Sequence, residues 1–287
     1  MAGTRPGMTP GVCRVLDTIS SNQQIFAANR ASGRIAVQAV AQDGRTRRAR
    51  VHEAGSLRVR FPNRADALEA VFVNTAGGMT GGDRFSISLA VGEDAHLIAG
   101  TAAAEKIYRS TGADAEMALT LNVAAGGRLA WLPQETILFD RARLTRSIEI
   151  DLAENAALIM TEAVILGRAA MGEAMNNGLF SDRWRLRRSG RLIFAENARL
   201  DGAIAGKLAR RAVTAGGIAI ATVLVAPGDE TAIAPVRALV GAGEIGISAW
   251  NGIAVARLVA HDGAALRHDL MAVLAALGQS VPRLWLQ

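Results

Sequence analysis

Apolar and polar residues alternate with a period of two through much of the chain, which is the pattern of half-buried β-strands. The clearest alternation runs from Phe85 to Val91, where every second residue is large and apolar. Similar stretches occur at 34–40, 57–61, 117–123, 148–152 and 183–187. Continuous apolar runs at 218–225 and 253–260 indicate buried strands. Short strands separated by glycine turns predict a mainly β fold.

Helical patterns are few. The best one covers 264–277, where Leu266, Leu270 and Leu274 lie on one stripe, Asp262 can cap the start and Gly278 can end it. A second helix is expected over 162–173, and the pattern at 101–109 leaves helix and non-helix open. Asp43-Gly44 is a hairpin signal. We expect residues 1–32 to be a loosely ordered lead-in and residues 33–287 to form one β-rich domain.

Paired glycines surround the start of the clearest strand. Gly77-Gly78 and Gly81-Gly82 enclose Met79-Thr80, and Asp83 follows directly. Glycine pairs permit positive φ or the close approach of another backbone. The segment lacks a Gly-Lys-Ser/Thr ending and precedes a strand, which argues against a nucleotide phosphate loop. A structural turn is the simplest interpretation.

Composition indicates a globular protein in a reducing compartment. Half of the 287 residues are hydrophobic and 20% are charged. Cys13 is the one cysteine, so an internal disulfide and a cysteine-rich zinc site are excluded. The first residues lack the apolar core of a signal peptide, and no run reaches the ~18 apolar residues of a membrane span. We therefore expect a cytoplasmic protein without membrane contact.

The formal charge of +6 favours an acidic partner. Part of the excess lies in two arginine-rich stretches, TRRAR at 46–50 and RWRLRR at 183–188. Aromatic residues make up only 4% of the chain, which leaves few platforms for stacking on nucleic acid. An acidic protein surface is at least as good an interpretation as a polyanion.

Candidate chemistry is confined to carboxylates, because the four histidines are scattered and no Gly-x-Ser-x-Gly elbow occurs. Glu135 and Asp140 flank one apolar segment. Glu162 and Glu173 are eleven residues apart and would share a face of a continuous helix. Such carboxylates could hold a divalent ion weakly, or they could be ordinary solvated or salt-bridged acids.

Five segments together resemble the UreD (also UreH) family of urease accessory proteins. They are NTAGGMTGGD at 74–83, KIYRS at 106–110, WLPQETILFD at 131–140, EAVILGRAAMGE at 162–173 and VPRLW at 281–285. They follow the family order over nearly the whole chain. Ala102 departs from the family pattern, since a glutamine is common there.

The resemblance implies a non-enzymatic maturation scaffold with a β-helix-like stack of strands and few helices, one of them near the C-terminus. Such proteins bind the urease apoprotein and the helical protein UreF, which recruits the GTPase UreG. Nickel would pass through in transit, with no tightly bound cofactor. GTP chemistry would belong to UreG, in agreement with the missing phosphate loop.

The resemblance also selects site residues, none of them catalytic. The candidates for a transient nickel path are the acids Asp83, Glu135, Asp140, Glu162 and Glu173. The candidates for the motif or partner surface are Gly77, Gly78, Gly81, Gly82, Tyr108, Arg109 and Arg168. Two other classes stay open: a carbohydrate-active β-helix enzyme, which the low aromatic content disfavours, and a nucleic-acid-binding protein, which only the positive charge suggests.

Overall fold

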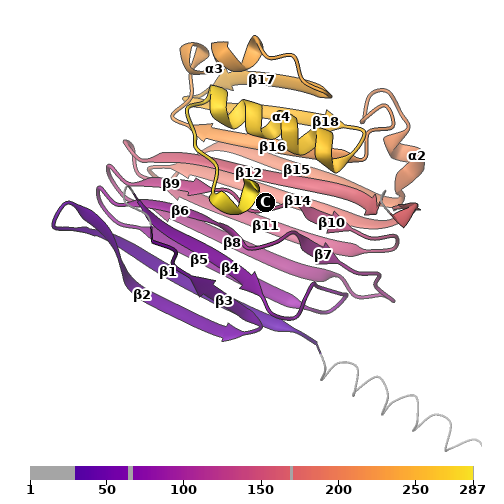
Figure 1. Cartoon of the computed structure of the whole chain (residues 1–287), viewed down its shortest axis with the longest axis horizontal. Helices are drawn as coiled ribbons and strands as arrows, with labels where there is room; N and C mark the ends of the chain where they lie inside the picture. Colours follow the sequence, from indigo (N-terminus) through magenta and orange to yellow (C-terminus); the bar gives the residue numbers. More distant parts are fainter. Residues whose placement is uncertain (1–29, 64–66, 169–170, 287) are drawn as a thin grey trace, which may run out of the picture.

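Two β-sheets make up most of the protein (Figure 1). The computed structural model describes residues 30–63, 67–168 and 171–286. The predicted lead-in at 1–32 therefore lies almost wholly outside the described residues. None of the helices in the described ranges is long and apolar enough to cross a lipid bilayer.

The first sheet has seven strands, and its inner neighbours from β1 to β14 are parallel. The outer strands β2 and β15 each pair antiparallel with the strand before them, as hairpins. In spatial order the strands are β15 (Arg191–Ala203), β14 (Asn177–Arg188), β11 (Arg143–Leu152), β8 (Ala115–Val123), β5 (Arg84–Val91), β1 (Ser32–Gln42) and β2 (Arg45–Gly55).

The second sheet has eleven strands, with a parallel centre formed by β4, β6, β9 and β12. Its main path is β17 (Glu244–Trp250), β18 (Ile253–Ala260), β16 (Ala219–Ala226), β12 (Ala157–Arg168), β9 (Arg128–Trp131), β6 (His96–Thr101), β4 (Leu68–Asn74) and β3 (Leu57–Arg60). Three short strands lie off this path: β7 (Glu105–Ile107), β10 (Thr136–Leu138) and β13 (Glu173–Ala174).

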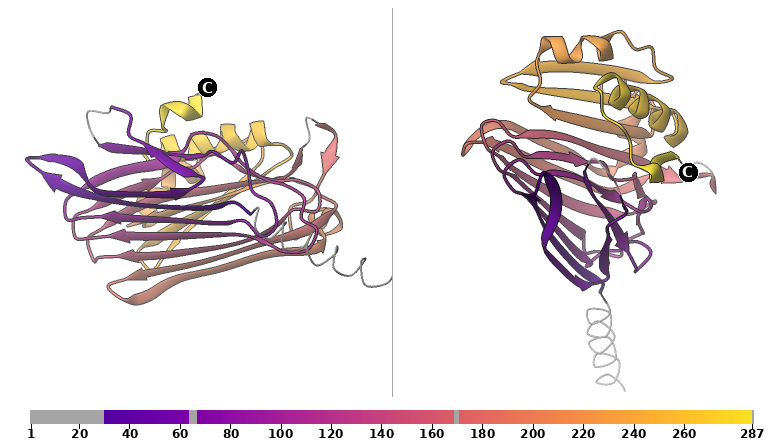
Figure 2. Two further views of the ribbon diagram at one scale, coloured as in Figure 1. Left: turned by 90° about the horizontal axis from the view of Figure 1, so that it is seen from below. Right: turned by 60° about the vertical axis from the view of Figure 1, so that its left-hand side comes forward.

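The chain passes repeatedly from one sheet to the other, so each coil adds one strand to each sheet. Figure 2 shows the strands of successive coils in stacked layers, with the indigo β1–β2 hairpin at one end. Strands β7 and β10 pair in parallel and form a short third side. The β-helix-like prediction is therefore confirmed.

Side chains at matching positions of successive coils form rows inside the stack. Ile87 pairs with Leu119, Leu119 with Ile148, and Ile148 with Trp184, and all four are buried. Parallel strands in register place matching residues side by side, and side chains alternate between the two faces of a strand. An alternating apolar pattern in every coil therefore builds one continuous core, as the period of two predicted.

The apolar run predicted at 218–225 is a strand buried on both faces. It is β16, whose Leu224 and Ala226 belong to the core between the sheets. Its Ala221 and Val223 face a second core under helix α4 (Gly263–Ala276). Because both faces are covered, the strand carries no polar alternation.

The helix predicted near the end of the chain is confirmed as α4. Asp262 caps it, with Oδ1 accepting a hydrogen bond from the N–H of Ala265 at 2.8 Å, and Gly278 follows with φ of +72°. Two shorter helices are α2 (Ile204–Leu208) and α3 (Glu230–Arg237). The hairpin signal is also confirmed, because Asp43 and Gly44 both have positive φ in the β1–β2 turn.

The helix predicted over 162–173 is wrong. Residues up to Arg168 belong to β12, which lies between β9 and β16 in the second sheet. Five consecutive residues from Met160 to Val164 are buried, so the segment has no polar helical face. Gly167, with φ of +105°, precedes the end of the strand. The ambiguous segment at 101–109 contains the short strand β7.

Close packing between coils predicts a specific glycine requirement. A Cβ atom on Gly100 of β6 would lie 2.4 Å from the carbonyl oxygen of Leu132, whereas one on Gly246 of β17 would meet no heavy atom within 4 Å. We expect Gly100→Ala to lower the free energy of unfolding by about 1–3 kcal/mol, because the backbone must shift. Urea titration checks this, with Gly246→Ala as the control; equal effects would contradict it.

Candidate functional site

The glycine-rich segment forms a tight loop against the third side of the stack. Met79 forms a parallel bridge with Ile107, through Met79 N to Lys106 O at 2.7 Å and Tyr108 N to Met79 O at 2.7 Å. A Cβ on Gly78 would lie 2.4 Å from the Tyr108 ring. The first glycine pair therefore permits a close approach, as its composition predicted.

Asp83 holds this loop together. Its Oδ1 accepts a hydrogen bond from the N–H of Ala31 and its Oδ2 accepts one from the N–H of Thr80, both at 2.8 Å. The residue is only 4% exposed. These bonds give Asp83 a structural task, and its contact with a metal or a partner stays a prediction.

A buried ionic cluster occupies the interior between the two sheets. Arg146 of β11 binds Asp182 of β14 through two hydrogen bonds, Nε to Oδ1 at 2.9 Å and Nη2 to Oδ2 at 2.6 Å. Its Nη1 donates to Oε2 of Glu162 on β12. The other Glu162 oxygen accepts a hydrogen bond from Nε1 of Trp131 at 2.8 Å. The side chains of Arg146, Glu162 and Asp182 are 2%, 6% and 7% exposed.

The rows of the stack explain how these groups meet. Arg146 and Asp182 are register partners on adjacent parallel strands, both at positions that face the interior. Glu162 points toward them from the opposite sheet. Every donor and acceptor of a buried charge needs a partner, and here three segments of the chain supply them.

The cluster carries one more carboxylate than cation. Burial raises the pKa of Glu162, and the nearby charge of Asp182 adds to this, while Arg146 opposes both. Burial would lower the pKa of Arg146, but the charges of Asp182 and Glu162 raise it above its ordinary value. The guanidinium therefore stays charged, and Glu162 is the carboxyl whose charged form burial disfavours. A proton or a second cation would balance the extra carboxylate.

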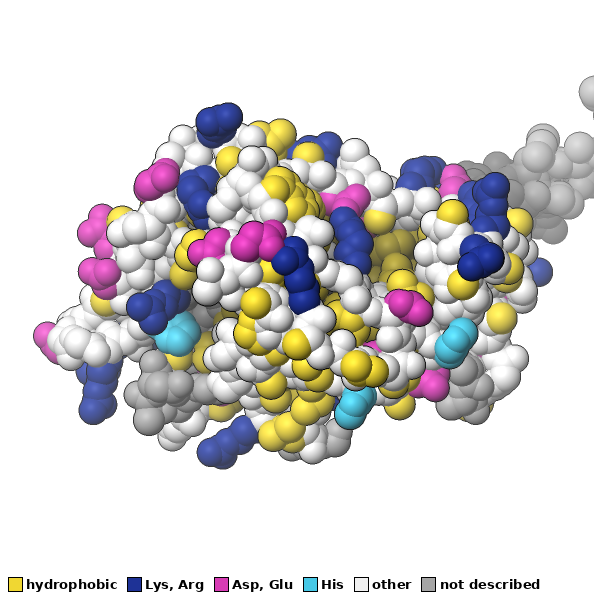
Figure 3. All heavy atoms as spheres, turned by 90° about the horizontal axis from the view of Figure 1, so that it is seen from above, with side chains coloured by type: hydrophobic (Ala, Val, Ile, Leu, Met, Phe, Trp, Pro, Cys, Tyr) yellow, Lys and Arg dark blue, Asp and Glu magenta, His cyan; other side chains and the backbone are white. Residues whose placement is uncertain are grey.

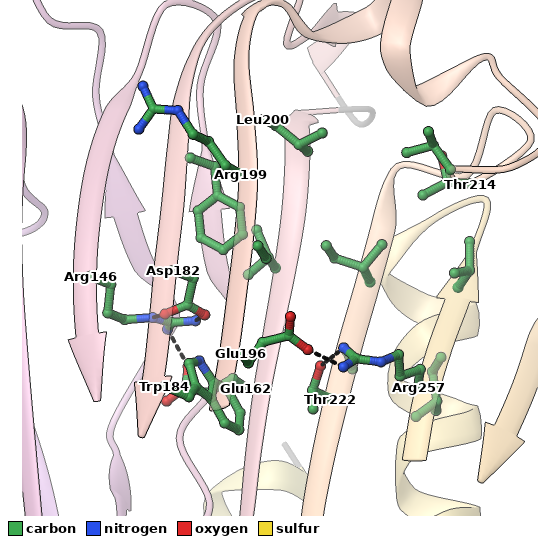
Figure 4. A pocket seen from close by; sticks show the side chains of 18 of the residues that line it. Arg146, Glu162, Asp182, Trp184, Glu196, Arg199, Leu200, Thr214, Thr222 and Arg257 are labelled. Carbon is green, nitrogen blue, oxygen red and sulfur yellow. Dashed lines mark hydrogen bonds and ion pairs between the residues drawn. The ribbon is translucent and has the colours of Figure 1, made fainter. Parts of the chain in front are cut away.

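Two cavities meet at this cluster, because Arg146 and Glu162 line both of them. The first, of about 240 Å³, lies between β14–β15 and β16–β18 (Figure 4). The ion pair of Glu196 with Arg257 crosses it from β15 to β18. The second, of about 360 Å³, extends from the cluster past Trp131 to the glycine loop. The ionic cluster thus lies where the two cavities adjoin.

Glu105 lines the second cavity near the glycine loop. Its Oε1 accepts a hydrogen bond from Nδ2 of Asn74 at 2.9 Å. Burial raises the pKa of Glu105 from 4.5 to about 7, against the smaller opposing effect of that hydrogen bond. This carboxyl group therefore changes charge close to neutral pH.

Glu135 fixes the end of the described chain to the stack. Its carboxylate accepts two hydrogen bonds from Arg267 of α4, at 2.9 and 2.7 Å. Arg267 also donates to the carbonyl of Trp285 at 3.1 Å, and the Trp285 ring donates to the carbonyl of Leu132 at 3.1 Å. Gln134 completes the group by donating to the carbonyl of Leu284 at 3.0 Å. We call these contacts the C-terminal latch.

Asp140 and Arg109 lie near the third side. The Oδ1 atom of Asp140 accepts hydrogen bonds from the N–H groups of Asn176 and Asn177, at 2.7 and 3.1 Å. This carboxylate therefore holds the start of β14. The carbonyl of Arg109 accepts a hydrogen bond from the hydroxyl of Thr80.

The other predicted surface residues come together around one aromatic ring. Tyr108 meets Phe139 edge to face, with ring centroids 5.0 Å apart, and the Arg168 guanidinium carbon lies 4.1 Å from the Phe139 centroid. Arg168 also pairs with Glu173. The Tyr108 hydroxyl donates to the carbonyl of Gly77 at 3.0 Å. These groups form a partly exposed aromatic–arginine surface beside the glycine loop.

Of the five acids predicted for a nickel path, only Glu162 lines either cavity. The other four bind backbone N–H groups or arginines outside the cavities, and their role in metal transfer stays a prediction. Across the ranges that the structure describes, no three His, Cys, Asp or Glu side chains are grouped so that they could hold a metal ion.

Comparison with known proteins decides the family. The model of the UreD urease accessory protein family matches residues 31–286. The chain belongs to the UreD family. A urease accessory protein UreD of Rhodopseudomonas palustris strain BisB18 is 58% identical over 283 residues, which is 97% of this chain and 100% of that relative. Another, of strain BisA53, is 55% identical over 285 residues, 98% of each chain.

A UreD protein of Bradyrhizobium diazoefficiens is 56% identical over 271 residues, which cover 93% of this chain and 98% of the relative. The family assignment made from the five segments is therefore confirmed, and this UreD chain is a urease accessory protein.

The sequence interpretation did not identify Arg146 and Asp182 of the ionic cluster, although the alternating pattern of this UreD chain contains the information needed. Arg146 continues the inward positions of Ile148 and Ile150 by one step, and Asp182 continues those of Trp184. A charged residue at an inward position of a strand needs a buried partner. Extending the alternating patterns that contain Ile148 and Trp184 by two residues toward the N-terminus would have identified Arg146 and Asp182 as buried charged residues.

Removal of the cluster's cation should leave two unpaired buried carboxylates. We expect Arg146→Met to lower the free energy of unfolding by about 3–5 kcal/mol at pH 8. Without the guanidinium, the already raised folded-state pKa of Glu162 rises further, because the charge of Arg146 that opposed the shift is gone. That cost is fully present at higher pH and shrinks as the pH falls, so the deficit should be smaller at pH 5 than at pH 8.

Denaturant titrations at both pH values measure this, with Arg146→Met/Glu162→Gln/Asp182→Asn as the matched control. The triple variant should recover much of the lost stability and be less sensitive to pH. A deficit of equal size at both pH values would show that only packing was lost.

Glu105 should make the protein less stable as the pH rises through neutrality. Its pKa is raised from 4.5 to about 7, so ionisation costs nothing well below pH 4.5 and costs most above pH 7. At about 1.4 kcal/mol per pKa unit, Glu105→Gln should be more stable than wild type by about 3 kcal/mol at pH 8 and nearly equal at pH 4. Denaturant titration at each pH checks this; a constant difference would refute it.

Proposed function

We propose that this UreD chain delivers nickel to the urease apoprotein and that the ion crosses the interior of the stack at the Arg146–Glu162–Asp182 cluster. The observation that carries the proposal is that two cavities adjoin one buried, net acidic cluster. Nickel is here the cargo and not a resident cofactor.

The charge balance of the cluster suits a cation in passage. Two carboxylates share one guanidinium, so the cluster has one uncompensated negative charge when both are ionised, and a divalent ion could replace the proton that otherwise balances it. Only two carboxylates are within reach there, and the guanidinium competes for both. A site with few oxygen ligands holds a divalent ion weakly, which favours onward transfer over storage.

The walls of the second cavity support entry from the glycine loop. Glu105 lies there, with a pKa of about 7, so it is substantially ionised at neutral pH and can attract a cation. The opposite cavity contains Glu196, whose ion pair with Arg257 spans the space between β15 and β18. Acidic groups therefore occur on both sides of the cluster.

The partners in this proposal are those that the family resemblance implies: the urease apoprotein, UreF, and UreG through UreF. The aromatic–arginine surface beside the glycine loop offers a contact for one of them, since Tyr and Arg are enriched among residues that dominate binding energy. In this arrangement GTP hydrolysis occurs in UreG, and this chain acts in the cytoplasm without an enzymatic step.

The carbohydrate-active alternative has less support. Inverting and retaining glycosidases need two free carboxyl groups on either side of a sugar. In this chain Glu162 and Asp182 are both bound to Arg146, and Trp131 donates to Glu162 instead of presenting an open stacking face.

The test is urease activation in a host that carries the urease subunits and the other accessory proteins at fixed nickel. Purified urease is assayed for bound nickel and activity with no UreD chain, with the wild-type chain and with Glu162→Gln. Glu149→Gln is the matched control, because Glu149 also pairs with arginines but lies on the outer face of β11. Co-purification with urease reports assembly.

We expect nickel-poor, folded urease without the chain and full loading with wild type or Glu149→Gln. Glu162→Gln should keep the complex assembled and lower nickel loading several-fold, because the surplus charge is gone. Normal loading with Glu162→Gln would exclude this route. Unchanged metallation without the chain would reject nickel delivery itself, and lost assembly would assign Glu162 a structural role.

A further inference from the structure

The seven-stranded sheet ends in an exposed, arginine-rich strand. β2 pairs with β1 alone, so the other edge of its backbone has no strand beside it within the described residues. Only Thr46 and Ala54 of its 11 residues are half-buried, and the rest are exposed. This edge is at the far end of the stack from β17 and α3 (Figure 1).

Pairing with β1 aligns three arginines on one face of β2. Val37 and Ala39 of β1 point into the core, and the partners of Arg45, Arg47 and Arg50 are the β1 residues that point outward. The register of the β1–β2 pair shifts by one residue at Ala49, so Arg50 lies on the same face as Arg45 and Arg47 although it is three positions after Arg47. Alternate residues of a strand are about 7 Å apart, so the guanidinium groups form a row along the edge.

These three arginines have no acidic partner among the described residues. Several exposed arginines elsewhere are paired, among them Arg84 with Glu116, Arg183 with Glu149 and Arg237 with Glu230. Others, such as Arg191 and Arg210, are as exposed as those of β2 but do not form a row on one strand. On the face above α3 and α4, basic and acidic side chains are interspersed (Figure 3). The β1–β2 hairpin instead contains five arginines and two acids within 32–55.

We propose that the free edge of β2 binds an extended acidic segment of a partner protein by strand addition. The backbone edge supplies N–H and C=O groups for a new ladder. An added strand has the same two-residue repeat as β2, so acids at alternate positions would lie opposite Arg45, Arg47 and Arg50. This interaction is independent of the cavities and of nickel delivery.

Nucleic acid fits the same edge less well. The hairpin from Ser32 to Gly55 contains no Phe, Tyr or Trp on which a base could stack. A polynucleotide also lacks the regularly spaced N–H and C=O groups that would pair with the free backbone edge of β2. A flat strand edge with a regular row of charges matches a polypeptide.

Fluorescence anisotropy with the full chain tests the proposal. The probe is a labelled nine-residue peptide in which Glu alternates with Val. It is compared with the same peptide N-methylated at alternate backbone positions, with a Lys–Val peptide and with a DNA duplex. The variant is Arg45→Ser/Arg47→Ser/Arg50→Ser. The matched control, Arg84→Ser/Arg191→Ser/Arg237→Ser, removes the same charge from exposed arginines elsewhere.

We expect the acidic peptide to bind the wild-type chain and to slow amide hydrogen exchange in β2. It should bind the β2 variant about tenfold more weakly, because each exposed ion pair contributes only a small part of the binding free energy. The control variant should bind as wild type does, and N-methylation should weaken binding similarly. The proposal would be overturned if the acidic peptide did not bind, or if the control variant lost as much affinity as the β2 variant. It would also be overturned if N-methylation left binding unchanged, or if the DNA duplex bound more tightly than the peptide.

Discussion

Parallel stacking of the coils in register determines both the backbone and the interior of this protein. Each inner strand forms its hydrogen bonds with the coils before and after it. A side chain therefore cannot move from the interior to the surface without shifting the register of the neighbouring strands. The same constraint brings Arg146 beside Asp182, which is 36 residues later in the chain. Because the row is buried, its polar members must neutralise one another within adjacent coils or across to the other sheet.

The ionic cluster places three charged groups in an otherwise apolar core, where the loss of hydration costs free energy. Replacing buried ion pairs with well-packed apolar residues is often neutral or stabilising in proteins, so a cluster of this kind adds little to stability by itself. The neighbouring rows, occupied by residues such as Leu119, Ile148 and Ile150, show that this interior accommodates apolar side chains. A need for stability therefore does not account for the charge inside the stack, and the proposed passage of an ion would give it a role.

Sequence patterns were sufficient for the strands with clear alternation, for α4 and for the family, because alternation and capping are local properties. They were insufficient where contacts between coils decide the outcome. The segment that became β12 resembles a helix by composition and glycine spacing, and its pairing with β9 and β16 made it a strand. The partners of Arg146 could not be read from spacing, since one lies on the next coil and the other on the opposite sheet. The pairing of Glu135 with Arg267 could not be read from spacing either, because the two residues are 132 positions apart.

The C-terminal latch has a consequence for the order of folding. Trp285 donates to the carbonyl of Leu132 across 153 positions, and Gln134 reaches Leu284 across 150. During synthesis the coils around Leu132 are complete long before residues 284 and 285 exist. Contacts over such separations form slowly, because a long loop must close first. Until then the surface of the second sheet that will lie under α4 is uncovered, so a nascent chain passes through a stage in which this apolar face needs protection.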